Sequence, residues 1–111
     1  MIEIILPEGL EKIPDYTLWT CKSLSELVVP EGVTTIEYCA FGQCTAMERI
    51  YLPKSVTVIE QAAFYMCKSL KEIYFEGTKE EWEAIQIAEK DNEKLFNVTV
   101  IFEYTKDSIA E

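Results

Sequence analysis

The chain of 111 residues contains no histidine. Histidine is the commonest general base, a frequent metal ligand and the side chain that titrates near neutral pH. The sequence also has no phosphate-binding glycine loop, no nucleophile motif and no carboxylate pair that stands out as catalytic. We therefore expect a protein that is not an enzyme and that uses no cofactor and no metal.

Basic residues are also scarce. The chain has 10 lysine and arginine residues against 20 aspartate and glutamate residues, which gives a net charge of −10. Nucleic acids and anionic lipid surfaces require a basic footprint on the protein that binds them. The charge therefore argues against a nucleic-acid partner and permits a basic protein as partner.

Long apolar runs and a leader are missing as well. No run approaches the roughly 20 apolar residues of a membrane-spanning helix, and the first residues lack the pattern of a signal peptide. We expect no membrane insertion. As written, the sequence favours a cytoplasmic protein, but a segment cut from a longer surface or secreted protein would look the same, so the compartment stays open.

What the sequence does contain is a repeat of 23 residues, the feature to be sought first in any chain. The spacing separates Pro7, Pro30 and Pro53. The same spacing gives further columns of like residues: Ile13, Ile36 and Ile59; Leu18, Phe41 and Phe64; Cys21, Cys44 and Cys67; Leu24, Met47 and Leu70. One such unit cannot cover its own apolar face, so the units are expected to stack as rungs with their strands paired.

Each unit has the same local pattern. Residues 24–29 predict a short strand, which Pro30 ends because proline cannot donate a ladder hydrogen bond. A turn at 31–32, a second extended piece at 33–36 and a compact helical or 3₁₀ turn at 37–44 complete the rung. We expect the phenylalanine and cysteine columns of this last turn to point inward.

These motifs resemble a known family. The pattern Ile-Glu-x-x-Ala-Phe-x-x-Cys at 36–44 and again at 59–67, followed by an apolar strand and proline, is similar to the BspA-type leucine-rich repeats. The resemblance covers about residues 2–75, although the first unit has Thr17 and Leu18 where Ala-Phe is usual. It implies an α/β solenoid, a right-handed leucine-rich-repeat coil of about three 23-residue rungs in residues 1–75. Members of the family are frequently adhesive surface proteins, and many have no assigned function.

The C-terminal part is different in pattern. Residues 76–104 predict a cap made of a helix near 79–87 and a strand near 97–104, and residues 105–111 predict a flexible tail. The motif Gly77-Thr78-x-x-x-Trp82 resembles the segment that often ends such arrays. Thr78 and Glu81 have the spacing of a capping box, and Trp82 with Ile85 is expected to cover the last rung.

The N-terminal edge has no predicted cap. Residues 3–6 match residues 26–29 by the repeat offset, so the chain begins inside a rung. We therefore expect that this uncapped edge strand permits self-association or pairing with a partner strand, alongside the simpler interpretation that a longer array was cut here.

The other candidate sites are weaker. We expect a ladder of free, buried thiols at Cys21, Cys44 and Cys67, and an exposed thiol on the turn at Cys39. Residues 91–93 are the nearest approach to a calcium loop. Trp19 and Tyr65, which share a repeat position with Gly42, predict a second surface patch on the turn side.

The outward face of the main sheet is the best candidate for binding. Two columns follow the strands of successive rungs, and we expect them to face solvent as an aromatic stripe beside a charged one. Their members are Val28, Tyr51 and Tyr74 in the first column, with Ile5 before them, and Glu26, Arg49 and Glu72 in the second, with Glu3 before them.

Three functions remain open from the sequence. The leading hypothesis is a noncatalytic protein–protein interaction or adhesion module that holds a protein or peptide on this face. The alternatives are a structural spacer or terminal fragment of a larger surface protein, and a small acidic inhibitor of a basic protein. The sequence gives no identity for the partner.

Overall fold

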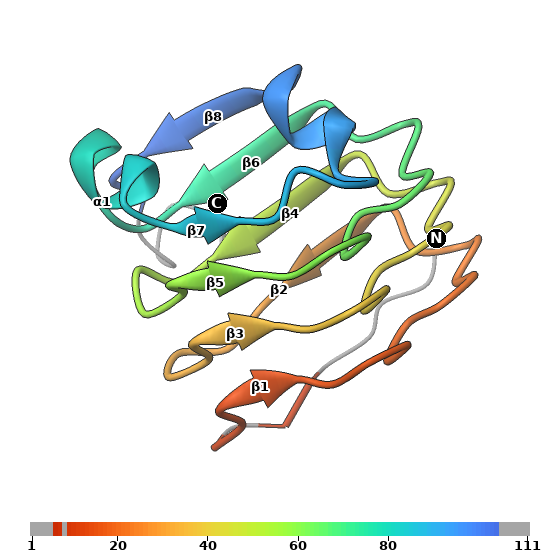
Figure 1. Cartoon of the computed structure of the whole chain (residues 1–111), viewed down its shortest axis with the longest axis horizontal. Coiled ribbons are helices and arrows are strands. Elements are labelled where there is room, and N and C mark those ends of the chain that lie inside the picture. The colour runs from red at the N-terminus through yellow and green to blue at the C-terminus, as the bar shows by residue number, and fades with distance from the viewer. Residues whose placement is uncertain (1–5, 8, 105–111) are drawn as a thin grey trace.

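The computed structural model describes residues 6–7 and 9–104 and shows them wound into a coil that measures 30 × 28 × 27 Å (Figure 1). Each turn of the coil contributes one strand to each of two sheets. The described elements, in chain order, are β1 (Lys12–Ile13), β2 (Glu26–Val28), β3 (Thr35–Ile36), β4 (Arg49–Leu52), β5 (Val58–Ile59), β6 (Glu72–Phe75), α1 (Lys79–Glu83), β7 (Gln86–Ile87), a 3₁₀ helix η1 (Glu93–Phe96) and β8 (Thr99–Phe102).

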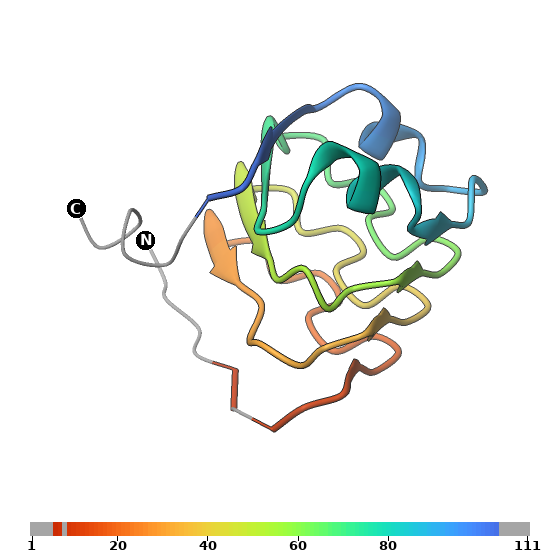
Figure 2. The same cartoon turned by 90° about the vertical axis from the view of Figure 1, so that its left-hand side faces the viewer.

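The strands form two parallel sheets of four strands each. One sheet has the order β1-β3-β5-β7 and the other β2-β4-β6-β8. Viewed at right angles to Figure 1, the two sheets line opposite sides of the coil, and the chain climbs from β1 to β8 (Figure 2). The register follows the repeat, since Leu27 pairs with Ile50 and Ile50 pairs with Ile73. The stacked rungs that the sequence predicts are therefore confirmed.

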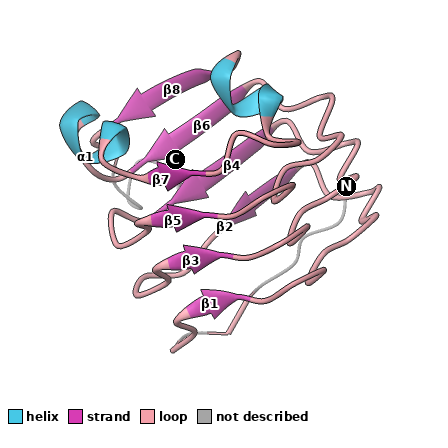
Figure 3. Ribbon diagram, in the orientation of Figure 1, coloured by secondary structure: helices cyan, strands magenta, loops and turns pink. Residues whose placement is uncertain are grey.

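The third side of the coil consists of turns (Figure 3). The predicted compact turn is not a helix there, because two residues in each rung adopt a left-handed backbone: Tyr16 and Thr20, Cys39 and Gln43, Ala62 and Met66. A non-glycine residue in this region interrupts any helical run. The turns are joined between rungs instead, for example by the Leu18 N–H, which donates to the Ala40 carbonyl at 2.8 Å.

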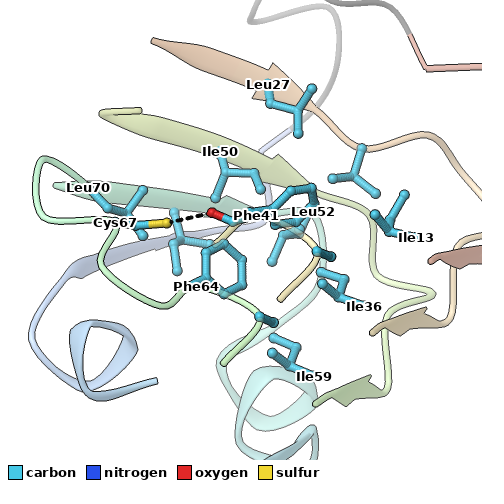
Figure 4. Packing of buried hydrophobic residues seen from close by; sticks show 14 of the residues in the cluster. Ile13, Leu27, Ile36, Phe41, Ile50, Leu52, Ile59, Phe64, Cys67 and Leu70 are labelled. Atoms are coloured by element: carbon cyan, nitrogen blue, oxygen red, sulfur yellow. Dashed lines mark hydrogen bonds between the residues drawn. The ribbon is translucent and has the colours of Figure 1, made fainter. Parts of the chain in front are cut away.

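The core fills the space between the sheets and the turns (Figure 4). Phe41 and Phe64, from neighbouring rungs, lie with ring centroids 5.3 Å apart. The isoleucine column of the β1-β3-β5-β7 sheet and the Leu27 column of the β2-β4-β6-β8 sheet pack around these two rings. Nearly all of the side chains in the two columns are fully buried. At about 1.5–3 kcal/mol for each large apolar side chain, the buried columns are the main source of stability.

The C-terminal residues continue the coil. β7 and β8 add a fourth strand to each sheet, so the described chain forms four strand layers rather than about three. The helix predicted near 79–87 ends at Glu83, because Gln86–Ile87 pairs with β5. Within residues 6–7 and 9–104 the helices are α1 and η1, of five and four residues, so the coil is a β-solenoid with little helix.

The Gly77-Thr78-x-x-x-Trp82 motif at the start of this last turn is explained by its local contacts. Thr78 and Glu81 form the predicted capping box, with the Glu81 N–H donating to Thr78 Oγ1 at 3.1 Å and the Thr78 N–H donating to Glu81 Oε1 at 2.9 Å. A Cβ on Gly77 would come within 2.7 Å of the Phe75 ring, so only glycine fits. Trp82 packs edge-on against Phe75, with ring centroids 5.4 Å apart, and Ile85 is buried.

Two expectations fall outside the described residues: the N-terminal edge at 3–6, of which only Leu6 is described, and the tail at 105–111. Within the described part of the chain, no helix is long and apolar enough to cross a membrane.

Candidate functional site

The predicted site residues lie on the outward face of the β2-β4-β6-β8 sheet, in two columns. Strand pairing places Glu26 beside Arg49 and Arg49 beside Glu72. It likewise places Val28 beside Tyr51 and Tyr51 beside Tyr74. β8 extends both columns with Thr99 and Ile101, which lie off the 23-residue spacing. The sheet thus brings all six predicted residues together.

The charged column is tied together by side-chain contacts. Arg49 Nε donates to Glu72 Oε1 at 2.9 Å, and this hydrogen bond raises the pKa of the Arg49 guanidinium. The Tyr74 hydroxyl donates to the same carboxylate oxygen at 3.4 Å. The Tyr51 hydroxyl donates to Glu26 Oε1 at 2.9 Å. Tyr51 and Tyr74 of the aromatic column are therefore bonded to carboxylates of the charged column. These hydrogen bonds fix the positions of the two rings.

The aromatic column differs in exposure along its length. Val28 at one end is 38% exposed and Tyr74 is half-buried, whereas Tyr51 in the middle is only 8% exposed. The rings of Tyr51 and Tyr74 are stacked, with centroids 4.8 Å apart and planes inclined by 24°. Burial, together with the bond to Glu26, raises the pKa of Tyr51 to about 12. Tyr51 is thus far less accessible than the sequence led us to expect.

Tyr104, which no repeat position predicts, covers part of the Tyr51 ring. Its ring centroid lies 5.7 Å from that of Tyr51 and 6.2 Å from that of Tyr74, and the side chain is 8% exposed. Burial raises the pKa of its hydroxyl. The chain reaches this position because Glu103 has a left-handed backbone, with φ of 57°, and its N–H donates to the Gly77 carbonyl at 3.0 Å.

The cysteines form a structural ladder. All four are free, and Cys44 and Cys67 are buried with their thiols donating to the Leu18 and Phe41 carbonyls at 3.1 and 3.0 Å. The buried-thiol prediction holds for these two, whereas Cys21 is half-buried. The expectation of an exposed Cys39 is wrong, because its side chain is buried. The backbone of Cys39 is left-handed at this point of the turn.

Asn92, in the weak calcium-loop candidate, has a structural role. It is fully buried, and its Oδ1 accepts the Phe64 N–H at 3.0 Å. Its Nδ2 donates to the carbonyls of Glu60 and Ala88 at 2.8 and 2.7 Å. The described residues contain no group of three or more cysteine, aspartate or glutamate side chains placed to hold a metal ion.

Comparison with known proteins agrees with this geometry. The sequence model of the BspA-type leucine-rich repeat region matches residues 1–103 in six copies. A crystal structure of a leucine-rich cell surface protein from Faecalibacterium prausnitzii A2-165 is similar at 38% sequence identity and a TM-score of 0.67. The similarity covers 68% of this chain and 20% of that one, so the matched region spans about a fifth of the length of the solved protein. No curated protein matches.

The family match spans nearly the whole chain, including the last turn, whose spacing differs from the others. The paired strands, and the buried phenylalanine and cysteine side chains of the second and third rungs, have the positions that the 23-residue repeat predicted. The chain belongs to the BspA-type leucine-rich repeat family.

Proposed function

We propose that this domain is a noncatalytic protein-interaction module that holds a protein or peptide on the outward face of the β2-β4-β6-β8 sheet. The observation that carries the proposal is the fixed column of tyrosines beside a charged column on that face. Tyrosine and arginine are enriched at protein interfaces, since both combine a large contact area with hydrogen bonding. Rings already held in place lose little conformational entropy when a partner binds.

The exposed end of the face is the place where a partner makes first contact. Val28 is the most accessible member of the aromatic column, and Glu26 lies on the same strand with its carboxylate bonded to Tyr51. A chain lying across these residues would contact Val28 and then Tyr74, while Tyr51 lies between them and stacks on the ring of Tyr74. The neighbouring carboxylates favour a partner that carries basic side chains.

The test is a peptide-display selection on the folded domain, followed by affinity measurements on the selected peptides. Val28→Lys places a positive charge at the accessible end without removing a buried side chain, and we expect it to weaken the binding of basic peptides by about tenfold or more, because it repels them. Gln86→Ala is the matched control, since Gln86 is an exposed strand residue of the other sheet. Selected peptides that bind Val28→Lys as tightly as the unmodified domain would contradict the proposal.

A second candidate is a spacer within a larger surface protein. It is supported by the solved cell surface protein, of which the similar region is only 20%. A spacer needs no binding face of its own. It predicts that the selection returns no peptide whose affinity depends on Val28, while the domain still folds and stacks onto further repeats when these are joined to it.

A further inference from the structure

A second group of aromatic side chains lies on the turn side of the coil, away from the sheet face. Tyr16, Trp19 and Tyr38 are 50%, 36% and 39% exposed. The ring of Tyr16 stands at 84° to that of Trp19 and at 89° to that of Tyr38, and both centroid distances are 5.5 Å. We call these three side chains the aromatic corner. Because neighbouring rings are perpendicular, two ring faces meet at a right angle, and one part of a ligand can contact both faces.

The backbone holds the aromatic corner in place. The Tyr16 N–H donates to the Tyr38 carbonyl at 3.1 Å, which fixes the two rungs relative to each other at this point. Trp19 lies directly over Gly42, where any Cβ would overlap its ring. The glycine therefore lets the indole pack down against the next rung. A ring fixed in this way is prepared for a ligand before the ligand arrives.

The charges around the aromatic corner favour a cation. Asp15 lies at its edge, where Oδ1 accepts the Tyr38 N–H at 3.1 Å. Glu37 precedes Tyr38 and has one basic neighbour, Lys12, at 4.0 Å. The faces of aromatic rings are themselves negative, and the whole chain has a net charge of −10. An anionic ligand would be repelled here.

We propose that the aromatic corner binds a trimethylammonium group. Such a group has a diffuse positive charge and a weakly held hydration shell, and aromatic rings meeting at an angle are the side-chain arrangement that recognises it by cation–π contact. Asp15 adds attraction at the edge. The same chemistry is presented by a small choline-like molecule and by a trimethylated lysine side chain. This site is independent of the sheet face, so neither proposal depends on the other.

The experiment uses the fluorescence of Trp19 in the Trp82→Phe variant, which leaves one indole in the chain. Choline is titrated against 3,3-dimethylbutan-1-ol, a neutral molecule of the same shape. We expect choline to change the Trp19 emission saturably and the neutral analogue to bind about tenfold more weakly or worse. Equal affinity of the two compounds, or no response of Trp19 to choline, would overturn the proposal.

Variants and further ligands complete the test. Tyr38→Leu keeps an apolar side chain but removes one ring, and it should weaken choline binding about fivefold or more. Tyr65→Leu, at the repeat position of Trp19 in the third rung, is the control and should have no effect. If Tyr38→Leu fails to fold, titration of the unmodified chain followed by the Trp19 indole proton in NMR takes its place.

Two more ligands distinguish the sources. A peptide with one trimethyllysine that binds about tenfold more tightly than choline identifies a methylated protein as the natural ligand, whereas equal affinity identifies a small molecule. Phosphocholine carries an added phosphate and should bind more weakly than choline, because Asp15 repels it. Tighter binding of phosphocholine would contradict recognition through the cation.

Discussion

The ring of Tyr104 lies against the ring of Tyr51, with centroids 5.7 Å apart, and both side chains are almost completely buried. The contact joins the end of the last turn to the middle of the candidate binding face. Removing it by Tyr104→Ala should cost about 2–4 kcal/mol of unfolding free energy, because a large, buried ring is lost. Urea denaturation measures the change.

Tyr104→Phe is the control for this substitution. It keeps the ring and removes only the hydroxyl, so we expect a change of less than about 1 kcal/mol. In Tyr104→Ala the Tyr51 ring becomes accessible, which near-ultraviolet circular dichroism should register as a loss of tyrosine signal. If Tyr104→Ala were as stable as the unmodified chain, the ring would not be packed on Tyr51 as described.

Asn92 is a second such position, where one side chain forms hydrogen bonds with three backbone groups. Asn92→Ala leaves the buried Phe64 N–H without its acceptor and removes the amide donor from two part-buried carbonyls, of which that of Glu60 keeps the Ala63 N–H. We expect a loss of about 2–3 kcal/mol, since an unpaired buried N–H costs about 1–3 kcal/mol and the lost hydrogen bonds to the carbonyls add to this cost. Asn97→Ala removes one hydrogen bond at an exposed residue and should change stability by less than about 0.5 kcal/mol. Equal effects of the two variants would contradict a special role of Asn92.

The register of the first three rungs could be predicted from the sequence because one spacing governs all of it. Once Leu27 and Ile50 are placed in neighbouring layers, the columns of the candidate face follow. The last turn could not be predicted in the same way. The insertion of α1 shifts the pairing of its strand β7 off the 23-residue spacing, so that Ile59 pairs with Ile87.

The burial of individual side chains was harder to predict than their direction. Tyr51 faces outward as the alternation indicates, but it is covered by Tyr104, which lies outside the repeat. Cys39 is buried and has a left-handed backbone that a non-glycine residue rarely adopts and that no local sequence signal announces. In both cases the missing information is a contact between segments, not a local preference.

The thiols should differ in reactivity. Burial raises the pKa of Cys44 to about 11 and that of Cys67 to about 12, so at pH 8 neither is ionised or accessible. Native labelling with Ellman's reagent should modify Cys21 first and the other three only after unfolding. Cys21→Ser should remove the fast phase. Rapid labelling of Cys44 or Cys67 in the folded chain would contradict their burial.

The same groups predict a loss of stability in alkaline solution. The folded pKa values of Cys44, Cys67 and Tyr51 lie above the ordinary values of 9.0 and 10.0, so the folded state holds protons that the unfolded state releases. The stabilising effect is fully present below about pH 9 and declines as the pH rises to about 12. Urea midpoints measured between pH 7 and 11.5 should fall with increasing slope. Replacing both thiols with alanine should flatten the first part of that fall, and an unchanged profile would contradict the assignment.

Gly77 provides the most local test of the last turn. In Gly77→Ala the new Cβ meets the Phe75 ring at 2.7 Å and Glu81 Oε1 at 2.9 Å, so the ring, the capping box or both must shift. We expect a cost of about 1–3 kcal/mol, which lowers the melting temperature by roughly 4–8 °C for each kcal/mol in a domain of this size.

A double-mutant cycle separates the two contacts of Gly77. Glu81→Ala alone removes the carboxylate that accepts the Thr78 N–H and should cost about 1 kcal/mol as a lost cap. In the Glu81→Ala background Gly77→Ala no longer meets the carboxylate, but it still meets the ring of Phe75, on which Trp82 packs. We therefore expect most of the cost of Gly77→Ala to persist there. If the cost disappears, the glycine is required by the capping box alone, and the Phe75 ring is free to move.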